Sequence, residues 1–201
     1  MAGQSLGEDD LDPDPLRQFQ RWYAEAHENE REPDAMALAT AGEDGMPSVR
    51  FVLLKAADES GFVFYTNWRS RKGKQLEANP RAALAFRWVL LERQVRVAGA
   101  VTKLDNASSD AYFATRPRAA QLGAWASAQS EPVASRADLD EHLEVVTARF
   151  AGRDVPRPPW WGGYRVVPEE FEFWVSHPDR LHDRFQYLKE GEGWLIRRLN
   201  P

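Results

Sequence analysis

Two arginines and a histidine lie within five residues near the end of the chain, in the segment Arg180–Arg184. They follow an aromatic-rich run that ends at Trp174. The two guanidinium groups are permanently cationic, and His182 between them can donate or accept a proton near neutral pH. Because such groups suit a planar, anionic ligand, this segment is the first candidate for the chemical centre.

Basic residues recur at two other places where a phosphate could bind. Arg50 and Lys55 bound an otherwise apolar run, but their odd spacing sends them to opposite faces of a regular strand unless a bulge intervenes. Residues 69–74 (RSRKGK) open a predicted helix, where cations are unfavourable unless an anion is present. The chain has neither a Gly-x-Gly-x-x-Gly nor a P-loop motif, so side chains would have to hold the phosphate. A solvated basic turn at 69–74, and a Lys55 that merely ends its strand, are the simpler alternatives.

Length and composition predict one soluble domain. The chain has 201 residues, of which 43% are hydrophobic and 28% charged. Its apolar runs are too short to cross a bilayer and its start is acidic and polar, which predicts a cytoplasmic protein. With no cysteine and four scattered histidines, we expect no metal site, and His27, His142 and His177 are expected at the surface. The net charge of −5 argues against nucleic-acid binding.

The chain begins with a predicted flexible acidic tail, residues 1–14, and the single domain then spans 15–201. A helix is expected over 15–28, where Leu16, Phe19 and Trp22 recur at helical spacing. Further helices are predicted over 70–78 and after Ser135, which is followed by Asp138 as in a helix cap. Short apolar segments divided by turns predict strands over 36–41, 48–56, 61–66, 82–89, 94–103, 163–167, 170–175 and 194–199. The fold class is therefore mainly β (α+β), a barrel with peripheral helices.

Several blocks of the chain resemble the motifs of one protein family, and they occur in the same order as in that family. The blocks are Arg50-Phe-Val-Leu-Leu-Lys55, Tyr65-Thr66, Ser70-Arg71-Lys72, Glu92-Arg93-Gln94-Val95, Tyr112-Phe113-x-x-Arg116-Pro117-Arg118, Gln121-Leu-Gly-Ala-Trp125, Gln129-Ser130, Trp161-Gly162-Gly163-Tyr164, and Glu172-Phe173-Trp174 with Arg180-Leu-His-Asp-Arg184. Together they resemble the pyridoxine (pyridoxamine) 5′-phosphate oxidases from about Asp14 to Pro201.

The resemblance implies a split β-barrel homodimer that binds FMN at its interface, while the charge and the short apolar runs described above argue against a nucleic-acid or membrane partner. It implies oxidation of pyridoxamine or pyridoxine 5′-phosphate to pyridoxal 5′-phosphate, with O2 as acceptor. Arg180 and His182 would be the catalytic pair that encloses the substrate's pyridine ring, and Lys55, Tyr112 and Arg116 would hold its phosphate. The flavin would be bound by Arg50, Phe51, Val52, Leu53, Leu54, Tyr65, Thr66, Arg71, Lys72, Gln94, Gln129, Ser130, Trp174 and Arg184.

Three departures from the family pattern concern substrate handling. Ala120 stands where a serine usually supplies a further phosphate donor, Val175-Ser176 replaces a common Gln-Gly, and the start of the chain has no Arg-x-x-Tyr element. Two alternatives therefore stay open. One is an FMN-dependent oxidase of secondary metabolism, of the phenazine-biosynthesis type, and the other is a non-catalytic protein that binds FMN or pyridoxal phosphate.

Overall fold

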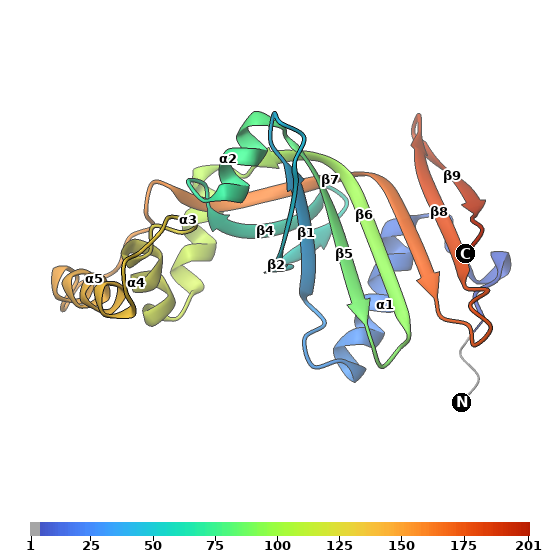
Figure 1. The fold of residues 1–201 in the computed structure, drawn as a ribbon. Coiled ribbons are helices and arrows are strands. Elements are labelled where there is room, and N and C mark those ends of the chain that lie inside the picture. Colours follow the sequence, from blue (N-terminus) through green and yellow to red (C-terminus); the bar gives the residue numbers. More distant parts are fainter. Residues whose placement is uncertain (1–4) are drawn as a thin grey trace.

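The computed structural model describes residues 5–201, and strands dominate it (Figure 1). Within that part, nine strands form one antiparallel sheet in the order β2-β1-β5-β6-β7-β4-β3, with β8 paired to β7 and β9 to β8. The strands are β1 (Ala35–Ala41), β2 (Pro47–Leu53), β3 (Ala56–Asp58), β4 (Gly61–Asn67), β5 (Arg81–Trp88), β6 (Arg93–Lys103), β7 (Trp161–Val175), β8 (Asp183–Glu190) and β9 (Gly193–Arg198). The mainly β class predicted from the sequence is confirmed.

Strand β7 is long enough to pair with different strands along its two halves. Along one edge it pairs with β6, while on the other its first half pairs with β4 and its second half with β8. The register shifts between Ala98 and Gly99, opposite Pro168. A Cβ on Gly99 would lie 1.9 Å from the carbonyl oxygen of Val167, so only glycine fits at this bulge. The sheet divides beyond the bulge into a β4–β3 end and a β8–β9 end.

Helix α1 (Pro15–Asn29) packs its buried residues into the main core against the sheet. Asp14 caps it, accepting a hydrogen bond from the backbone N–H of Leu16, and Pro15 occupies its first turn. Phe19, fully buried, contacts the rings of Phe62 and Phe86, and Trp22 meets Phe173 edge to face. The helical spacing found in the sequence therefore describes the buried face of α1.

A smaller core forms where α3 (Asn106–Thr115), α4 (Arg118–Ala126) and α5 (Arg136–Arg149) meet the start of β7. Its buried members are Phe113, Leu122, Phe150, Val155 and Trp161. These helices lie at one end of the sheet, and β8 and β9 lie at the other (Figure 1). The remaining helix, α2 (Arg71–Ala78), lies close to β1.

Most predicted elements are found, with three differences. The predicted strand 48–56 is broken: β2 ends at Leu53 and β3 begins at Ala56. The two strands predicted over 163–167 and 170–175 are the single strand β7. Helices α3 and α4 and strand β8 have no counterpart in the sequence prediction. The cap predicted at Ser135 is confirmed, because its side chain accepts from the backbone N–H of Asp138. Ser70, predicted as the first residue of its helix, instead caps α2 by accepting from the backbone N–H of Gly73.

The start of the chain is more closely attached than its acidic composition predicts. Residues 1–4 of the predicted tail lie outside the described residues. Leu6 is 5% exposed, and a short 3-10 helix (Glu8–Asp10) follows it. The backbone N–H of Leu6 donates to the carboxylate of Asp183 at 3.0 Å, and Arg198 pairs with Glu8 at 2.9 Å. Residues 5–10 thus lie against β8 and β9, because the backbone N–H of Leu6 and the carboxylate of Glu8 find partners there.

Candidate functional site

A cavity of about 890 Å³ opens between β2, β4 and the helices α2 to α4. Five of its lining residues are basic, and none of the described residues that line it is acidic. The lining side chains are Ser48, Val49, Arg50, Phe51, Val52, Leu53, Lys55, Tyr65, Thr66, Asn67, Arg71, Lys72, Tyr112, Arg116, Ala120, Gly123, Ala124, Ser127, Gln129, Ser130 and Trp161. Such an unbalanced concentration of cations suits an anionic ligand.

Arg50 and Lys55 both reach this cavity, in spite of their odd spacing. The reason is the end of β2 at Leu53, after which Leu54 and Lys55 turn toward β3. The predicted alternation therefore stops before Lys55. Arg50 is held in place by Thr40, whose Oγ1 accepts a hydrogen bond from it at 2.6 Å, and by Ser48 Oγ at 2.6 Å.

The buried ammonium of Lys72 is the strongest electrostatic feature of the cavity. Lys72 is 7% exposed, and its Nζ donates to Thr66 Oγ1 at 3.1 Å, Gln129 Oε1 at 3.1 Å and Ser70 Oγ at 3.3 Å. All three acceptors are uncharged. Burial, helped by the nearby charge of Arg50, lowers the pKa of Lys72 to about 8. A cation so placed would be stabilised by an anion arriving at the start of α2.

Three aromatic rings form a stacked wall beside the cations. Tyr65 and Tyr112 lie with centroids 3.9 Å apart and planes 13° apart, and Trp161 continues the stack at 5.5 Å from Tyr65. The guanidinium of Arg116 covers the ring of Trp161 at 4.6 Å. Its Nη1 is buried and has no hydrogen-bond partner among the described residues. Burial also raises the pKa of Tyr112, so its phenol keeps the proton that it can donate.

A second group of predicted residues lies outside this cavity, on the other half of β7. Gln94 of β6, Trp174 of β7 and Arg184 of β8 are direct cross-strand neighbours and form one row. The ring of His182 lies 4.6 Å from that of Trp174. Arg184 is oriented by the buried carboxylate of Glu172, which accepts from its Nε at 2.9 Å.

The predicted residues therefore divide into two sets within one chain. The first set lines the cavity: Arg50, Phe51, Val52, Leu53, Lys55, Tyr65, Thr66, Arg71, Lys72, Tyr112, Arg116, Gln129 and Ser130. The second set, Gln94, Trp174, Arg180, His182 and Arg184, lies near the β7–β8 connection and does not line it. Leu54 belongs to neither set, because it is 2% exposed in the main core.

Sequence reasoning assigned no role to several lining residues, among them Ser48, Asn67, Gly123 and Ser127, or to Glu172. The neutral lining residues come from different elements and share no spacing that marks them. Glu172 stands two residues before Trp174, on the same strand face, and that spacing could have identified it.

Two family models match most of the chain. One, described as pyridoxamine 5′-phosphate oxidase, matches residues 23–149. The other, described as the pyridoxine 5′-phosphate oxidase C-terminal dimerisation region, matches residues 161–201 and supports formation of a homodimer. No helix in the described part of the chain combines the length and apolarity needed to span a membrane.

Curated relatives agree along nearly the whole length. The pyridoxine/pyridoxamine 5′-phosphate oxidase of Rubrobacter xylanophilus is 59% identical over 197 residues, covering 98% of this chain and 91% of the relative. The enzyme of the same name from Cupriavidus taiwanensis is 55% identical over 199 residues, covering 98% and 93%.

Solved structures show the same split-barrel fold. PhzG from Burkholderia lata, in complex with tetrahydrophenazine-1-carboxylic acid, matches with a TM-score of 0.92 and 33% identity, covering 100% of both chains. A pyridoxamine 5′-phosphate oxidase-related, FMN-binding protein from Nostoc punctiforme matches in fold, with a TM-score of 0.72 and 18% identity over 94% and 98% of the two chains. Since the family models, the relatives and the fold agree, the chain belongs to the pyridoxamine 5′-phosphate oxidase family.

Proposed function

We propose that this protein is an FMN-dependent oxidase that converts pyridoxamine 5′-phosphate, pyridoxine 5′-phosphate or both to pyridoxal 5′-phosphate, with O2 as the electron acceptor. The observation that carries the proposal is the cavity with five basic residues and no acidic one among its described lining residues. Family membership supports an oxidoreductase, and the two phosphate-bearing ligands of this reaction account for so many cations in one place.

The residues around Lys72 fit the phosphate of FMN. Arg71 and Lys72 begin α2, so their charges and the free N–H groups of the helix start act together. Thr66 and Gln129 hold the ammonium through neutral oxygens, which leaves its charge available to an anion. The strand Arg50–Leu53 would lie along the flavin. When bound, FMN supplies the hydride acceptor that no side chain offers.

Lys55, Tyr112 and Arg116 fit the substrate's phosphate. They combine two cations with a phenol donor, and the buried Nη1 of Arg116, beside Trp161, has no hydrogen-bond partner among the described residues. Charge-assisted hydrogen bonds to a dianion are among the strongest available to side chains. By holding the phosphate away from the reacting carbon, these residues would use remote binding energy to align the substrate.

Each site is completed by a second copy of the chain in this proposal. Gln94, Trp174, Arg180, His182 and Arg184 do not line the cavity of their own chain, although they match flavin and substrate positions. The exposed side chains of the edge strand β2, Val49 (68%), Phe51 (76%) and Leu53 (49%), offer an apolar surface beside the cavity. A homodimer would cover this surface and bring the partner's Arg180 and His182 to the cavity.

A second candidate function is an oxidase that acts on a polycyclic substrate. The match to PhzG over both whole chains favours it, and Ala120 lines the cavity where a hydroxyl would contact a phosphate. Against it, Lys55, Tyr112 and Arg116 all line the same cavity, and two cations with a phenol donor suit a phosphate dianion better than a single carboxylate such as that of the PhzG ligand.

The test is to load the purified protein with FMN and incubate it with each of the two B6 phosphates in air. Formation of the aldehyde together with hydrogen peroxide is expected. FMN binding without turnover of either compound would favour the second candidate, and failure to bind FMN would overturn both.

A further inference from the structure

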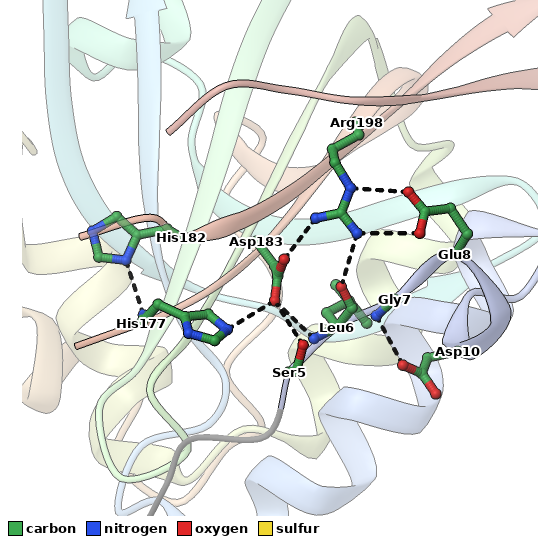
Figure 2. Close-up of polar contacts among 9 residues, drawn as sticks. All are labelled: Ser5, Leu6, Gly7, Glu8, Asp10, His177, His182, Asp183 and Arg198. Carbon is green, nitrogen blue, oxygen red and sulfur yellow. Dashed lines mark hydrogen bonds and ion pairs between the residues drawn. The ribbon is translucent and has the colours of Figure 1, made fainter. Parts of the chain in front are cut away.

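The imidazole of His182 has a fixed hydrogen-bond partner on one of its two nitrogens. Its Nδ1 lies 3.0 Å from the backbone nitrogen of His177, at the other end of the β7–β8 connection (Figure 2). A backbone N–H can only donate, so Nδ1 accepts. The lone pair of Nδ1 is therefore engaged within the chain.

This contact determines where the proton of a neutral ring resides. A neutral imidazole carries one N–H and one bare nitrogen, and here the bare nitrogen is Nδ1. The hydrogen is then on Nε2, which is a donor without a free lone pair. His182 in this state can offer a hydrogen bond to a ligand, and neither nitrogen is free to take a proton from it.

The side chain of His177 is itself anchored, by Asp183. The carboxylate Oδ2 lies 3.0 Å from His177 Nε2 and also accepts from the backbone N–H of Leu6 at 3.0 Å and from Ser5 Oγ at 3.3 Å. Arg198 donates to Oδ1 at 2.6 Å. Figure 2 shows the carboxylate at the centre of these donors. Burial alone would raise the pKa of Asp183, but the hydrogen bonds from Leu6, Arg198 and His177 hold it below its usual range.

The connection that carries His177 has a constrained backbone. Arg180 has φ of 62°, a left-handed conformation that is unfavourable for a residue with a Cβ, and its N–H donates to the carbonyl of His177 at 3.1 Å. The turn is thus closed at His177 and fastened to the sheet through Asp183. Release of His177 would free the backbone N–H that faces His182.

We propose that Asp183 and His177 are positioning residues that hold His182 as its Nε2–H tautomer, so that His182 donates a hydrogen bond to the substrate and does not serve as its base. This inference rests on the proposed function, since it assigns His182 a substrate. The proton that an amine substrate must lose then passes to water. The role of Asp183 is indirect: it fixes the turn from which the N–H of His177 is presented.

Nitrogen NMR of the histidine rings tests the tautomer directly, in the FMN-bound, full-length protein near neutral pH. Only four histidines are present, and His182→Gln identifies the signals of His182 by their loss. We expect a protonated Nε2 and an unprotonated Nδ1 in the wild type. A protonated Nδ1 in the wild type would overturn the proposal.

Two variants and a control test the positioning role. His177→Ala keeps the backbone N–H but removes the contact with Asp183, and Asp183→Asn weakens the same contact from the other side. Both should add the second tautomer of His182 to the spectrum. Glu8→Gln is the control, because Glu8 pairs with Arg198 and does not touch Asp183. If Asp183→Asn does not fold, His177→Ala still decides, since its side chain is partly exposed. An unchanged spectrum in His177→Ala would overturn the role of Asp183 and His177.

Kinetics separate a donor from a base. A glutamine amide can donate a hydrogen bond but cannot take a proton near neutral pH. We expect kcat/KM of His182→Gln to stay within about tenfold of the wild type, and His182→Ala to lose more than that. Equal, large losses in both would identify a base and overturn the proposal. Failure of the proposed function would be a different result: the wild type would oxidise neither B6 phosphate, whatever tautomer the spectrum shows.

Discussion

The Nζ atom of Lys72 lies 3.1 Å from Oε1 of Gln129, so a buried ammonium at the start of α2 faces an amide oxygen from the segment after α4. The amide of Gln129 is uncharged, so it does not neutralise the ammonium of Lys72. The contact orients the ammonium without cancelling its charge, and it links the helix start to the loop that carries Ser130, whose φ is 75°. An anion that enters the cavity would meet a donor that is already in position.

Replacing Lys72 should weaken FMN binding in the proposed site. We expect Lys72→Gln to raise the Kd for FMN by about 10- to 150-fold, because a hydrogen bond to a charged group contributes about 1.5–3 kcal/mol. Quenching of flavin fluorescence on binding gives the Kd. Lys74→Gln is the matched control: Lys74 lies on the same helix, but it is exposed and pairs with Glu131. Equal losses in both variants would show that the effect is only general electrostatic attraction.

The lowered pKa of Lys72 also predicts a pH dependence. Burial and the charge of Arg50 bring this pKa to about 8, so in the FMN-free protein the ammonium is charged below that pH and neutral above it. The phosphate of FMN has its second pKa at about 6 and is already a dianion there. FMN affinity should therefore fall as the pH rises from about 7 to 9, and Lys72→Gln should remove most of this slope. The same slope in the variant would assign it to another group.

The lowered pKa of Lys72 has the opposite effect on stability: FMN affinity falls as the pH rises, whereas the free energy of unfolding rises. The pKa of Lys72 is about 8 in the folded protein and 10.5 ordinarily. At a pH between these values the folded protein has released this proton, while the unfolded chain still holds it. Between about pH 8 and 10.5, this group makes the free energy of unfolding of the FMN-free protein increase with pH.

The sequence predicts the parts of the fold that depend on local signals. The spacing of Phe19 and Trp22 and the cap at Ser135 act over one or two helical turns, and the structure confirms them. Strand β7 could not be found whole, because Pro168 looks like a chain break. The strand continues through Pro168 by means of a bulge, at which Pro168 pairs with Gly99 of β6, a residue 69 positions away in the sequence.

The sequence allowed prediction of those residues of the candidate site that are charged. Arg71, Lys72 and Arg116 stand out in the sequence, and the structure brings them to one cavity. The row formed by Gln94, Trp174 and Arg184 depends on the register of three strands, which no local pattern fixes. Helices α3 and α4 were missed because each buries at most two side chains, too few to produce a helical period.

Arg116 should discriminate between the two proposed phosphate sites. We expect Arg116→Ala to raise KM for pyridoxamine 5′-phosphate by at least about tenfold, since a charge-assisted contact is lost, and to change the Kd for FMN much less. Arg136→Ala is the control, because Arg136 is exposed and pairs only with Asp140 among the described residues. Equal losses of substrate and FMN binding would contradict the assignment of Arg116 to the substrate.

Ala120 offers a gain-of-function test. It lines the cavity, and a hydroxyl there would add one donor for the substrate's phosphate. We expect Ala120→Ser to lower KM by about 2- to 10-fold, as one hydrogen bond contributes about 0.5–1.5 kcal/mol. Ala119→Ser places the same hydroxyl on the exposed neighbouring position and should change nothing. If neither variant alters KM for a B6 phosphate, the phosphate does not lie beside Ala120.

The proposed division of the site between two copies of the chain predicts complementation. Arg116 lies in the cavity and Arg180 near the β7–β8 connection, so in a homodimer each complete site would take one from each copy. A mixed dimer of an Arg116→Ala chain and an Arg180→Gln chain then has one site with both defects and one with neither. Two different affinity tags allow this dimer to be purified, and we expect it to show about half of the wild-type activity, although each variant alone shows little. If Arg116 and Arg180 of one chain served the same site, every site in the mixed dimer would carry one defect and activity would stay at the level of the variants. The measurement therefore decides whether the cationic cavity and the His182 segment of one chain ever act on the same substrate molecule.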